Sequence, residues 1–328
     1  MSTLSVLMPV RNGGDRLVRA LESVLGQDPA PDEVVLVDDG SDDGAVARAR
    51  ARFPSVRVLE PGAVGLVRAL ALGLEACTGD LVARMDADDL SLPGRFAAQR
   101  ALLDTTPEVG VCGCAVRSVK DDGPADEGFR RYDAWQNALL THEDIAREIF
   151  VESPLVHPSV VFRREAILAI GGYEDHGWPE DHDLWLRAYL AGLRFAKVPH
   201  LGLEWRDHDA RATRTDARYD RDAFLRMKAC YLARGPLAGR GEVVVWGAGR
   251  VGRRLARHLG ENGVTVSRFV DVDPKKIDGR RIVGPDALES LGDVFVIAAV
   301  GSRGARTLIR DALERAGFAE GERFLCAA

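Results

Sequence analysis

The chain has 328 residues, with 44 Lys and Arg against 50 Asp and Glu and a net charge of −6. This length predicts about two domains, and the acidic balance argues against a protein that coats nucleic acid without specificity. No stretch approaches the ~18 to 20 consecutive apolar residues of a membrane helix. The five cysteines are odd in number and have no zinc-site spacing. We expect the reducing cytoplasm as the default compartment.

Strand-like and helix-like segments alternate from the N-terminus to about residue 115. The predicted strands are 4–10, 33–37, 56–59 and 81–85, and the predicted helices are 15–26, 45–51 and 66–77. This alternation predicts a mostly parallel sheet with crossover helices. The pattern fails from Lys120 to Trp135, where residues 121–124 are expected to form a turn or mobile loop. Further helices are expected at 145–150, 163–170 and 183–191.

Clustered carboxylates follow two of the predicted strands. Asp38 and Asp39 end the second strand, and Asp86, Asp88 and Asp89 follow the fourth. Open α/β folds bind their ligands at this edge of the sheet. A helix N-cap would need one acid rather than three, and three neighbouring carboxylates repel one another unless a cation lies between them. The pattern therefore predicts a site for a nucleoside with a metal-bound diphosphate.

A second α/β segment follows the Gly-Pro-Leu-Ala-Gly run at 235–239. We expect one domain at 1–235, a linker at 236–241 and a small Rossmann-like domain at 242–328. The second domain opens on a strand that leads into a glycine-rich turn, with an acid after the next strand: Gly247, Gly249, Gly252 and Asp271. The pattern fits the dinucleotide fingerprint. Helix–strand packing alone also requires such glycines, so NAD(P), another nucleotide and a merely structural turn all stay open.

The first 235 residues resemble glycosyltransferase family 2, the inverting nucleotide-sugar transferases with the GT-A fold. The matching motifs stand in the family's order at residues 7–12, 37–41, 65–70, 86–89, 157–159, 171–173, 179–187 and 205–208. One departure is Ala71, where the family usually carries Asn. The resemblance implies a GT-A domain followed by the Rossmann-like module.

The resemblance also implies a hexose donor, expected to be UDP-linked, and a divalent cation, Mn²⁺ or Mg²⁺. Asp88 and His208 would hold the metal, and Asp86 would contact the ribose or a metal-bound water. The remaining donor-binding residues implied by the family pattern are Pro9, Arg11, Asp39 and Arg68.

An inverting displacement needs one general base for the acceptor hydroxyl. Glu180 and Asp181 lie just before the predicted helix, where backbone amides would hold a carboxylate ionised and oriented. Asp183 is expected to be the cap of that helix. The family pattern implies Asp181 as the base, with Glu180 as the alternative. Tyr173 and Trp178 border the same loop and are expected either to stack on sugar or acceptor or to pack.

The acceptor is less constrained. Residues 131–135, 246–255, 270–273 and 321–325 resemble eukaryotic β-1,3-N-acetylglucosaminyltransferase-like proteins assigned as tRNA-queuosine galactosyltransferases, which makes tRNA one expected partner. A cell-surface polysaccharide or glycolipid precursor is the alternative. Twelve Lys and Arg stand against six acids from 184 to 240, a balance suited to phosphates, although helix ion pairs would explain most of it. Hypotheses of another class are a nucleotidyltransferase and an NAD(P)-dependent redox protein.

Overall fold

The computed structural model describes residues 2–120, 123–208, 211, 214 and 216–328. It divides into two compact units, each described here by itself. The first comprises Met1–Ala146, Pro154–His176 and Glu180–Thr215, and the second comprises Arg147–Ser153, Gly177–Pro179 and Asp216–Ala328. The linker that we expected at 236–241 stays a prediction.

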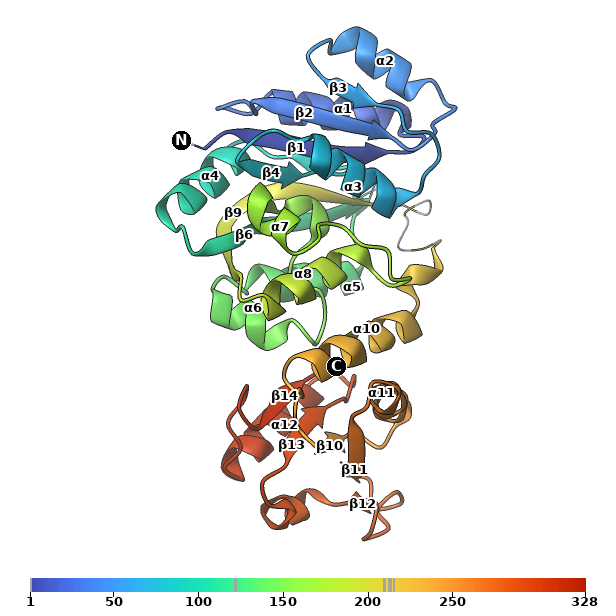
Figure 1. The fold of residues 1–328 in the computed structure, drawn as a ribbon, viewed down its shortest axis with the longest axis vertical. Helices are drawn as coiled ribbons and strands as arrows, with labels where there is room; N and C mark the ends of the chain where they lie inside the picture. The colour runs from blue at the N-terminus through green and yellow to red at the C-terminus, as the bar shows by residue number, and fades with distance from the viewer. Residues whose placement is uncertain (1, 121–122, 209–210, 212–213, 215) are drawn as a thin grey trace. The chain divides into compact units, whose positions relative to one another are not determined.

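The sheet of the first unit is largely parallel at one end and mixed at the other. Its strand order is β3-β2-β1-β4-β8-β6-β9-β5, with β7 beside β6. β1 pairs in parallel with both β2 and β4, and Figure 1 shows β3, β2, β1 and β4 next to one another. The strands are β1 (Leu4–Val10), β2 (Glu33–Asp38), β3 (Arg57–Leu59), β4 (Leu81–Arg84), β5 (Leu90–Ser91), β6 (Val109–Lys120), β7 (Gly123–Pro124), β8 (Val161–Arg163) and β9 (Arg194–Asp207). The four strands predicted before residue 90 are confirmed.

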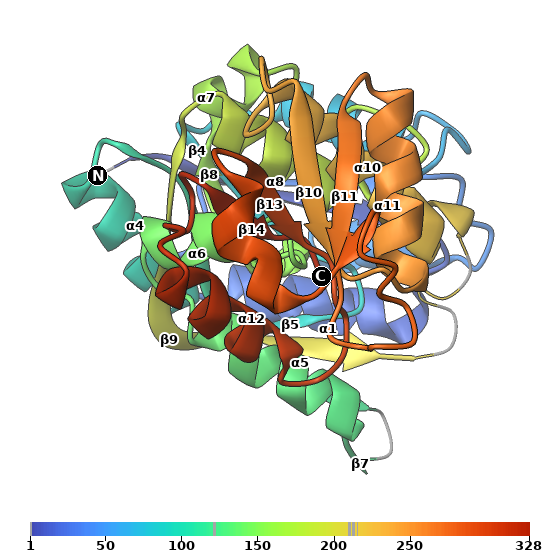
Figure 2. The same cartoon turned by 90° about the horizontal axis from the view of Figure 1, so that it is seen from below.

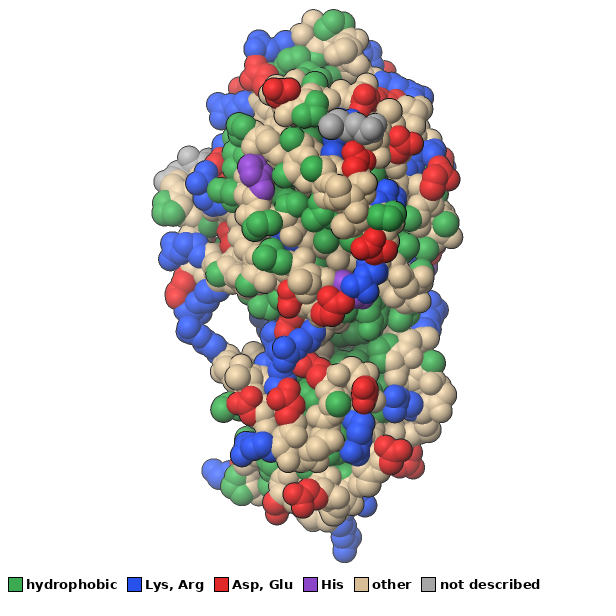
Figure 3. All heavy atoms as spheres, turned by 90° about the vertical axis from the view of Figure 1, so that its left-hand side faces the viewer, with side chains coloured by type: hydrophobic (Ala, Val, Ile, Leu, Met, Phe, Trp, Pro, Cys, Tyr) green, Lys and Arg blue, Asp and Glu red, His purple; other side chains and the backbone are tan. Residues whose placement is uncertain are grey.

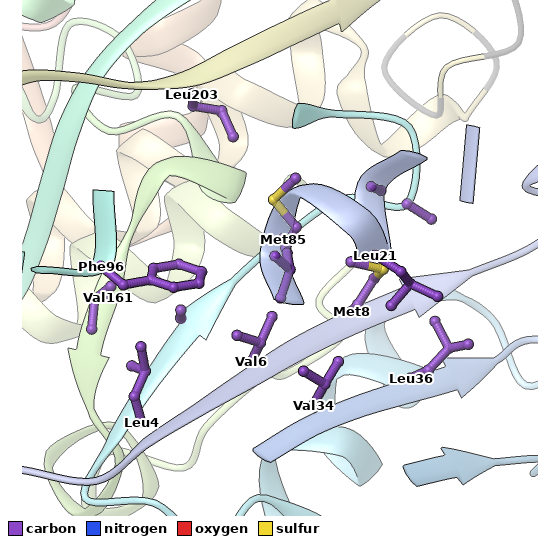
Figure 4. Packing of buried hydrophobic residues seen from close by; sticks show 14 of the residues in the cluster. Leu4, Val6, Met8, Leu21, Val34, Leu36, Met85, Phe96, Val161 and Leu203 are labelled. Atoms are coloured by element: carbon purple, nitrogen blue, oxygen red, sulfur yellow. The ribbon is translucent and has the colours of Figure 1, made fainter. Parts of the chain in front are cut away.

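A central core lies on one face of this sheet. Every residue of β1 is buried, as expected for a parallel strand covered on both faces. Leu4, Val6 and Met8 alternate along β1 and point to one side, where they belong to one cluster with Leu36 of β2 and Leu21 (Figure 4). Leu21 comes from helix α1 (Gly14–Leu25), which buries its apolar stripe against the sheet.

The remaining helices of the first unit include several predicted segments and one surprise. They are α2 (Ala45–Arg52), α3 (Leu66–Ala76), α4 (Arg95–Thr105), α5 (Glu127–Asn137), α6 (His142–Glu148), α7 (Arg164–Ala169) and α8 (Glu180–Leu190). Helices α1, α2 and α3 match the predicted segments. Helix α5 lies where we expected no regular structure. The sequence did not predict it, because its buried residues Asp133 and Gln136 are polar and the apolar pattern of an amphipathic helix is missing. The Asp133 carboxylate instead accepts hydrogen bonds from the Ser118 N–H and hydroxyl, at 2.7 and 2.8 Å.

Two further expectations are corrected. Gly123–Pro124 forms the short strand β7 rather than a turn, while residues 121–122 lie outside the described residues. Helix α8 begins at Glu180, so Asp183 is not its cap. Asp183 is fully buried within the helix and pairs with Arg187 at 2.8 Å.

The second unit has its own parallel sheet, in the order β12-β11-β10-β13-β14. The strands are β10 (Glu242–Trp246), β11 (Thr265–Val270), β12 (Ile282–Val283), β13 (Phe295–Ala298) and β14 (Phe324–Cys326), and the helices are α10 (Arg221–Arg234), α11 (Arg250–Glu261) and α12 (Ala305–Arg315). Figure 2 shows β10 and β11 side by side with α11 next to them. A second α/β domain is therefore present, as the sequence predicted. No helix within the described ranges has both the length and the apolar character needed to cross a bilayer.

We expect Gly252→Ala to destabilise the second unit and Gly249→Ala to be tolerated. A Cβ on Gly252 would lie 1.8 Å from the Gly247 carbonyl oxygen, whereas a Cβ on Gly249 would meet no atom within 4 Å. The overpacked variant should lose about 1–3 kcal/mol or more, and the Gly249 variant less than about 1 kcal/mol. Thermal unfolding of both variants checks this, and equal melting temperatures would contradict it.

Candidate active site

An acidic cluster lies in the loop that follows β4. Asp86, Asp88 and Asp89 each offer an oxygen within 4.8 Å of the others. Asp89 Oδ1 accepts a hydrogen bond from the Arg206 N–H at 2.7 Å, while its buried Oδ2 has no hydrogen-bond partner among the described residues. Burial raises the pKa of Asp89 well above its usual value, and the charges of Asp88 and Asp86 add to this effect. An all-oxygen set with one unsatisfied buried atom fits a hard divalent cation.

His208 reaches this cluster from the loop after β9. Its Nε2 lies 2.6 Å from Oδ2 of Asp88, although 120 residues separate the two in sequence. Burial opposes ionisation of Asp88, but the hydrogen bond with His208 and the charge of Arg211 lower its pKa overall. The structure thus brings together the two residues predicted to hold a metal.

The residues predicted for the nucleoside end lie in β1, just after β1 and β2, and in α3. Asp39 follows β2, and its Oδ1 accepts hydrogen bonds from the backbone N–H groups of residues 64 and 65, both at 2.7 Å. Asp39 therefore fixes the loop that leads into α3. Pro9 is buried in β1, whereas Arg11 and Arg68 are exposed. Their contacts with a nucleotide stay predictions.

A cavity of about 390 Å³ lies beside the N-terminus of α1. It is lined by Asn12, Gly13, Gly14, Asp15, Arg16, Arg19 and Arg206. Three arginines give the cavity a positive lining that suits an anionic group. The sequence did not reveal it, because Arg206 is far from the other lining residues along the chain.

The predicted base and its alternative lie in the first turn of α8 rather than before the helix. Asp181 Oδ1 accepts a hydrogen bond from the His182 N–H at 2.7 Å. Burial of the carboxyl group raises the pKa of Asp181 to about 8, and the charge of Glu180 contributes. Glu180 is only 2% exposed, and one of its carboxylate oxygens lies 3.6 Å from Nδ1 of His157.

Two residues for which the sequence indicated no role, Arg84 and His157, contact carboxyl groups of the site, and Tyr173 contacts His157. The Arg84 guanidinium is buried and forms an ion pair with Asp86. His157 Nε2 lies 2.9 Å from the hydroxyl of Tyr173, and burial followed by the charge of Arg84 lowers the pKa of His157. Tyr173 itself is 5% exposed. The available signals were a charged residue in an apolar strand for Arg84 and the His-Pro-Ser motif for His157.

Trp178, the other residue expected near sugar or acceptor, belongs to the second unit. Its ring packs edge-on against Tyr231, with centroids 6.2 Å apart. Whether Trp178 or Tyr173 contacts an acceptor stays a prediction.

The acid of the predicted nucleotide fingerprint is already bonded to the turn and to a nearby lysine. Gly247 has a φ of +119° and precedes α11. Asp271 Oδ2 accepts a hydrogen bond from the Ala248 N–H at 2.9 Å and lies 3.1 Å from Lys276 Nζ. Asp271 Oδ1 accepts another from the Asp273 N–H at 3.0 Å. The acid expected to bind a ribose therefore holds the turn itself.

Comparison with known proteins gives a consistent result. The sequence pattern of Glycosyl transferase family 2 matches residues 5–171, about half of the chain. The amylovoran biosynthesis glycosyltransferase AmsE of Erwinia amylovora is 35% identical over 189 residues, which cover 56% of this chain and 68% of AmsE. The UDP-Gal:alpha-D-GlcNAc-diphosphoundecaprenol beta-1,3-galactosyltransferase of Escherichia coli is 29% identical over 195 residues, covering 58% of this chain and 68% of that protein.

A solved structure shares the fold. The S. aureus TarS fragment 1–349 in complex with UDP-GlcNAc superimposes with a TM-score of 0.57 at 18% identity, over 71% of this chain and 67% of that one. Sequence and fold agree, and the enzyme is a glycosyltransferase rather than a nucleotidyltransferase. The chain has the GT-A fold with a second α/β domain, and it belongs to glycosyltransferase family 2.

Proposed function

We propose that this enzyme transfers a hexose from a UDP-linked donor to a hydroxyl acceptor with inversion, and that Asp181 is the general base. The observation that carries the proposal is that the first unit contains two separate sets of acidic residues. The cluster of Asp86, Asp88 and Asp89 offers oxygens for a metal-bound diphosphate. The Glu180–Asp181 pair offers a carboxyl group whose pKa is raised toward neutrality, as suits a base.

The reaction is a single displacement. The acceptor oxygen forms a bond to the anomeric carbon while the bond from that carbon to the β-phosphate oxygen breaks. The Asp181 carboxylate takes the hydroxyl proton, and the electron pair of the broken bond leaves with the nucleoside diphosphate. Glu180 and His157 fix the surroundings of the base, since both are buried and close to each other.

The leaving diphosphate is negatively charged and would be repelled by the carboxylates of the acidic cluster without a cation. Asp88 with His208 would hold Mn²⁺ or Mg²⁺, and Asp86 would orient the ribose or a bound water. A cation there supplies positive charge to the leaving group. The positively lined cavity next to Arg206 adds to the favourable field for an anionic donor.

The proposed acceptor is a hydroxyl of a polysaccharide or glycolipid precursor. Two relatives support this class: AmsE is named for amylovoran biosynthesis, and the E. coli galactosyltransferase is named for a GlcNAc-diphosphoundecaprenol acceptor.

Queuosine in tRNA is the second candidate acceptor, supported by the resemblance of the C-terminal motifs. The charges are less favourable to it. Several Lys and Arg side chains between residues 184 and 240 pair with acids of the same unit, as Arg194 does with Glu143 and Arg214 with Asp207. On the face shown in Figure 3, Lys and Arg are interspersed with Asp and Glu, unlike the positive stripe of a tRNA-binding surface.

For the second unit we propose that the glycine-rich turn is architectural rather than an NAD(P) site. Asp271 would have to give up its bonds to Ala248 and Lys276 to accept a ribose hydroxyl. A thermal shift of several degrees on addition of NAD(P) would contradict this proposal.

Asp88→Asn should abolish metal-dependent donor binding. Losing even an outer partner of a metal ligand costs about 10- to 100-fold in affinity, so loss of the ligand itself should weaken UDP binding by about 100-fold or more. Calorimetric titration of UDP with Mn²⁺ and with chelator measures the effect, and Asp104→Asn on an exposed helix end is the control. Undiminished wild-type affinity in chelator would contradict the metal role.

Asp181→Asn should keep donor binding but lose transfer by about 10²-fold or more, the scale of a positioned base. Glu180→Gln is the matched variant, since it neutralises the neighbouring carboxylate and keeps its shape. We expect a smaller loss of kcat for Glu180→Gln. If the order of the two losses were reversed, Glu180 would be the base.

The kcat/KM for transfer should rise with pH along an acid limb whose midpoint lies near 8. Asp181 must be ionised to accept the proton, and its raised pKa of about 8 leaves it protonated at lower pH. Below the midpoint the rate should fall about tenfold per pH unit. A pH–rate profile at fixed metal concentration tests this, and a limb near pH 4 would contradict the burial argument.

A further inference from the structure

The end of β9 carries His208 to the acidic cluster and is tied to that cluster at a second point. His208 Nε2 lies 2.6 Å from Asp88 Oδ2, and the Arg206 N–H donates to Asp89 Oδ1 at 2.7 Å. A side chain that must be ordered when a ligand binds weakens that binding by its lost conformational freedom. Contacts that hold His208 in place beforehand therefore bear directly on metal binding.

The ring of Trp205, near the end of β9, forms an aromatic platform beside this segment. It lies edge-on to the ring of Phe129, with centroids 5.7 Å apart, and its centroid is 6.0 Å from that of Tyr132. Both partners belong to α5. Trp205 and Tyr132 also pack against the central core of the first unit. The platform is therefore fixed by the folded core, independently of the residues that follow β9.

Arg211 contacts both this platform and the backbone of the proposed metal ligand. Its guanidinium lies over the Trp205 ring, with Cζ 4.2 Å from the ring centroid. Its N–H donates to the His208 carbonyl at 3.2 Å. Tryptophan is the aromatic residue that attracts a cation most strongly. The stacked pair of Arg211 and Trp205, which we call the clamp, thus joins the backbone of His208 to the core.

A second set of contacts supports the clamp from its other side. The Arg214 guanidinium donates to both carboxylate oxygens of Asp207, from Nε at 3.2 Å and from Nη2 at 2.6 Å. Asp207 itself is buried. The Arg214 N–H donates to the Arg211 carbonyl at 2.9 Å. Because a two-bond pair fixes orientation as well as distance, the backbone of Arg211 is held in place beside the end of β9.

We propose that Arg211 and Trp205 are positioning residues that hold His208 against Asp88 and so prearrange the site for a divalent cation. The inference rests on the proposed metal role of Asp88 and His208. It assigns neither member of the clamp a contact with the substrate or the metal. Since the effect needs both members, removing one should have the same consequence as removing the other, and removing both should add little.

A purely electrostatic role of Arg211 would have a different consequence. The pKa of Asp88 responds to burial, to the hydrogen bond with His208 and then to the charge of Arg211. Trp205→Leu removes the platform but leaves every charge around the acidic cluster in place. The tryptophan variant therefore separates the two roles, because only the clamp requires the ring.

The test is a double-mutant cycle of Trp205→Leu and Arg211→Met in the full-length enzyme. Calorimetric titration of UDP, with Mn²⁺ and with chelator, measures binding without turnover. Each single variant should weaken Mn²⁺-dependent binding by about 3- to 10-fold, the scale of a partly buried cation–π contact. The double variant should lose about the same factor as either single one, and binding in chelator should not change.

Arg52→Met is the matched control. The Arg52 guanidinium also lies over an aromatic ring of the first unit, 5.6 Å from the centroid of Phe53, but it has no contact with the end of β9, so its loss should leave binding unchanged. Trp205→Phe keeps a ring beneath Arg211 and should retain most of the affinity. Wild-type binding in Trp205→Leu with weakened binding in Arg211→Met, or losses that multiply in the double variant, would overturn the proposal.

A milder variant keeps the proposal testable if Trp205→Leu does not fold. Trp205→Tyr then takes its place in the cycle, because a phenol ring is smaller and attracts a cation less strongly. The proposed function fails differently. Equal UDP affinity of the wild-type enzyme with Mn²⁺ and with chelator would remove the metal role and the clamp with it. The clamp alone fails if wild-type binding depends on Mn²⁺ and both single variants bind as tightly.

Discussion

Repulsion among clustered, partly or fully buried carboxyl groups is the constraint around which the first unit is arranged. Asp86, Asp88 and Asp89 lie within 4.8 Å of one another, and a second pair follows in α8. Two carboxylates of the first set have a side-chain partner: Arg84 for Asp86, and His208 for Asp88. Among the residues that the structure describes, one buried oxygen of Asp89 has no hydrogen-bond partner. A crowded acidic edge is costly by itself, and a cation bound among the carboxylates would offset that cost.

The strand pairing explains how distant residues reach that edge. β1 lies between β2 and β4, and all three are parallel, so Asp39 and the acidic loop emerge on the same side. β5 pairs antiparallel with β9, with Leu90 opposite Glu204. The residue before β5 therefore meets the residues after Glu204, which places the N–H of Arg206 against Asp89. The histidine two positions further along then reaches the cluster.

The sequence was informative where local pattern and chemistry coincide. Apolar runs that end in acids correctly predicted β2, β4 and the acidic loop, because a short continuous apolar run is typical of a buried parallel strand. It failed at α5, whose inward positions are polar. It also indicated no role for Arg84, although its partner Asp86 lies two positions away, or for His157, whose partner Glu180 becomes a neighbour only through tertiary packing. The cavity with Arg206 was missed for the same reason.

The raised pKa of Asp181 shows that burial has a larger effect on this carboxyl group than the N-terminus of α8. A helix N-terminus stabilises a carboxylate by about 0.3–1 kcal/mol, less than the 1.36 kcal/mol that one pKa unit represents. Burial and the charge of Glu180 instead raise the pKa of Asp181 from its usual 3.8 to about 8, a change of several units. The helix terminus that was expected to keep this carboxylate ionised is therefore too weak to do so. The charge of Arg84 opposes this rise in the pKa of Asp181 but does not cancel it.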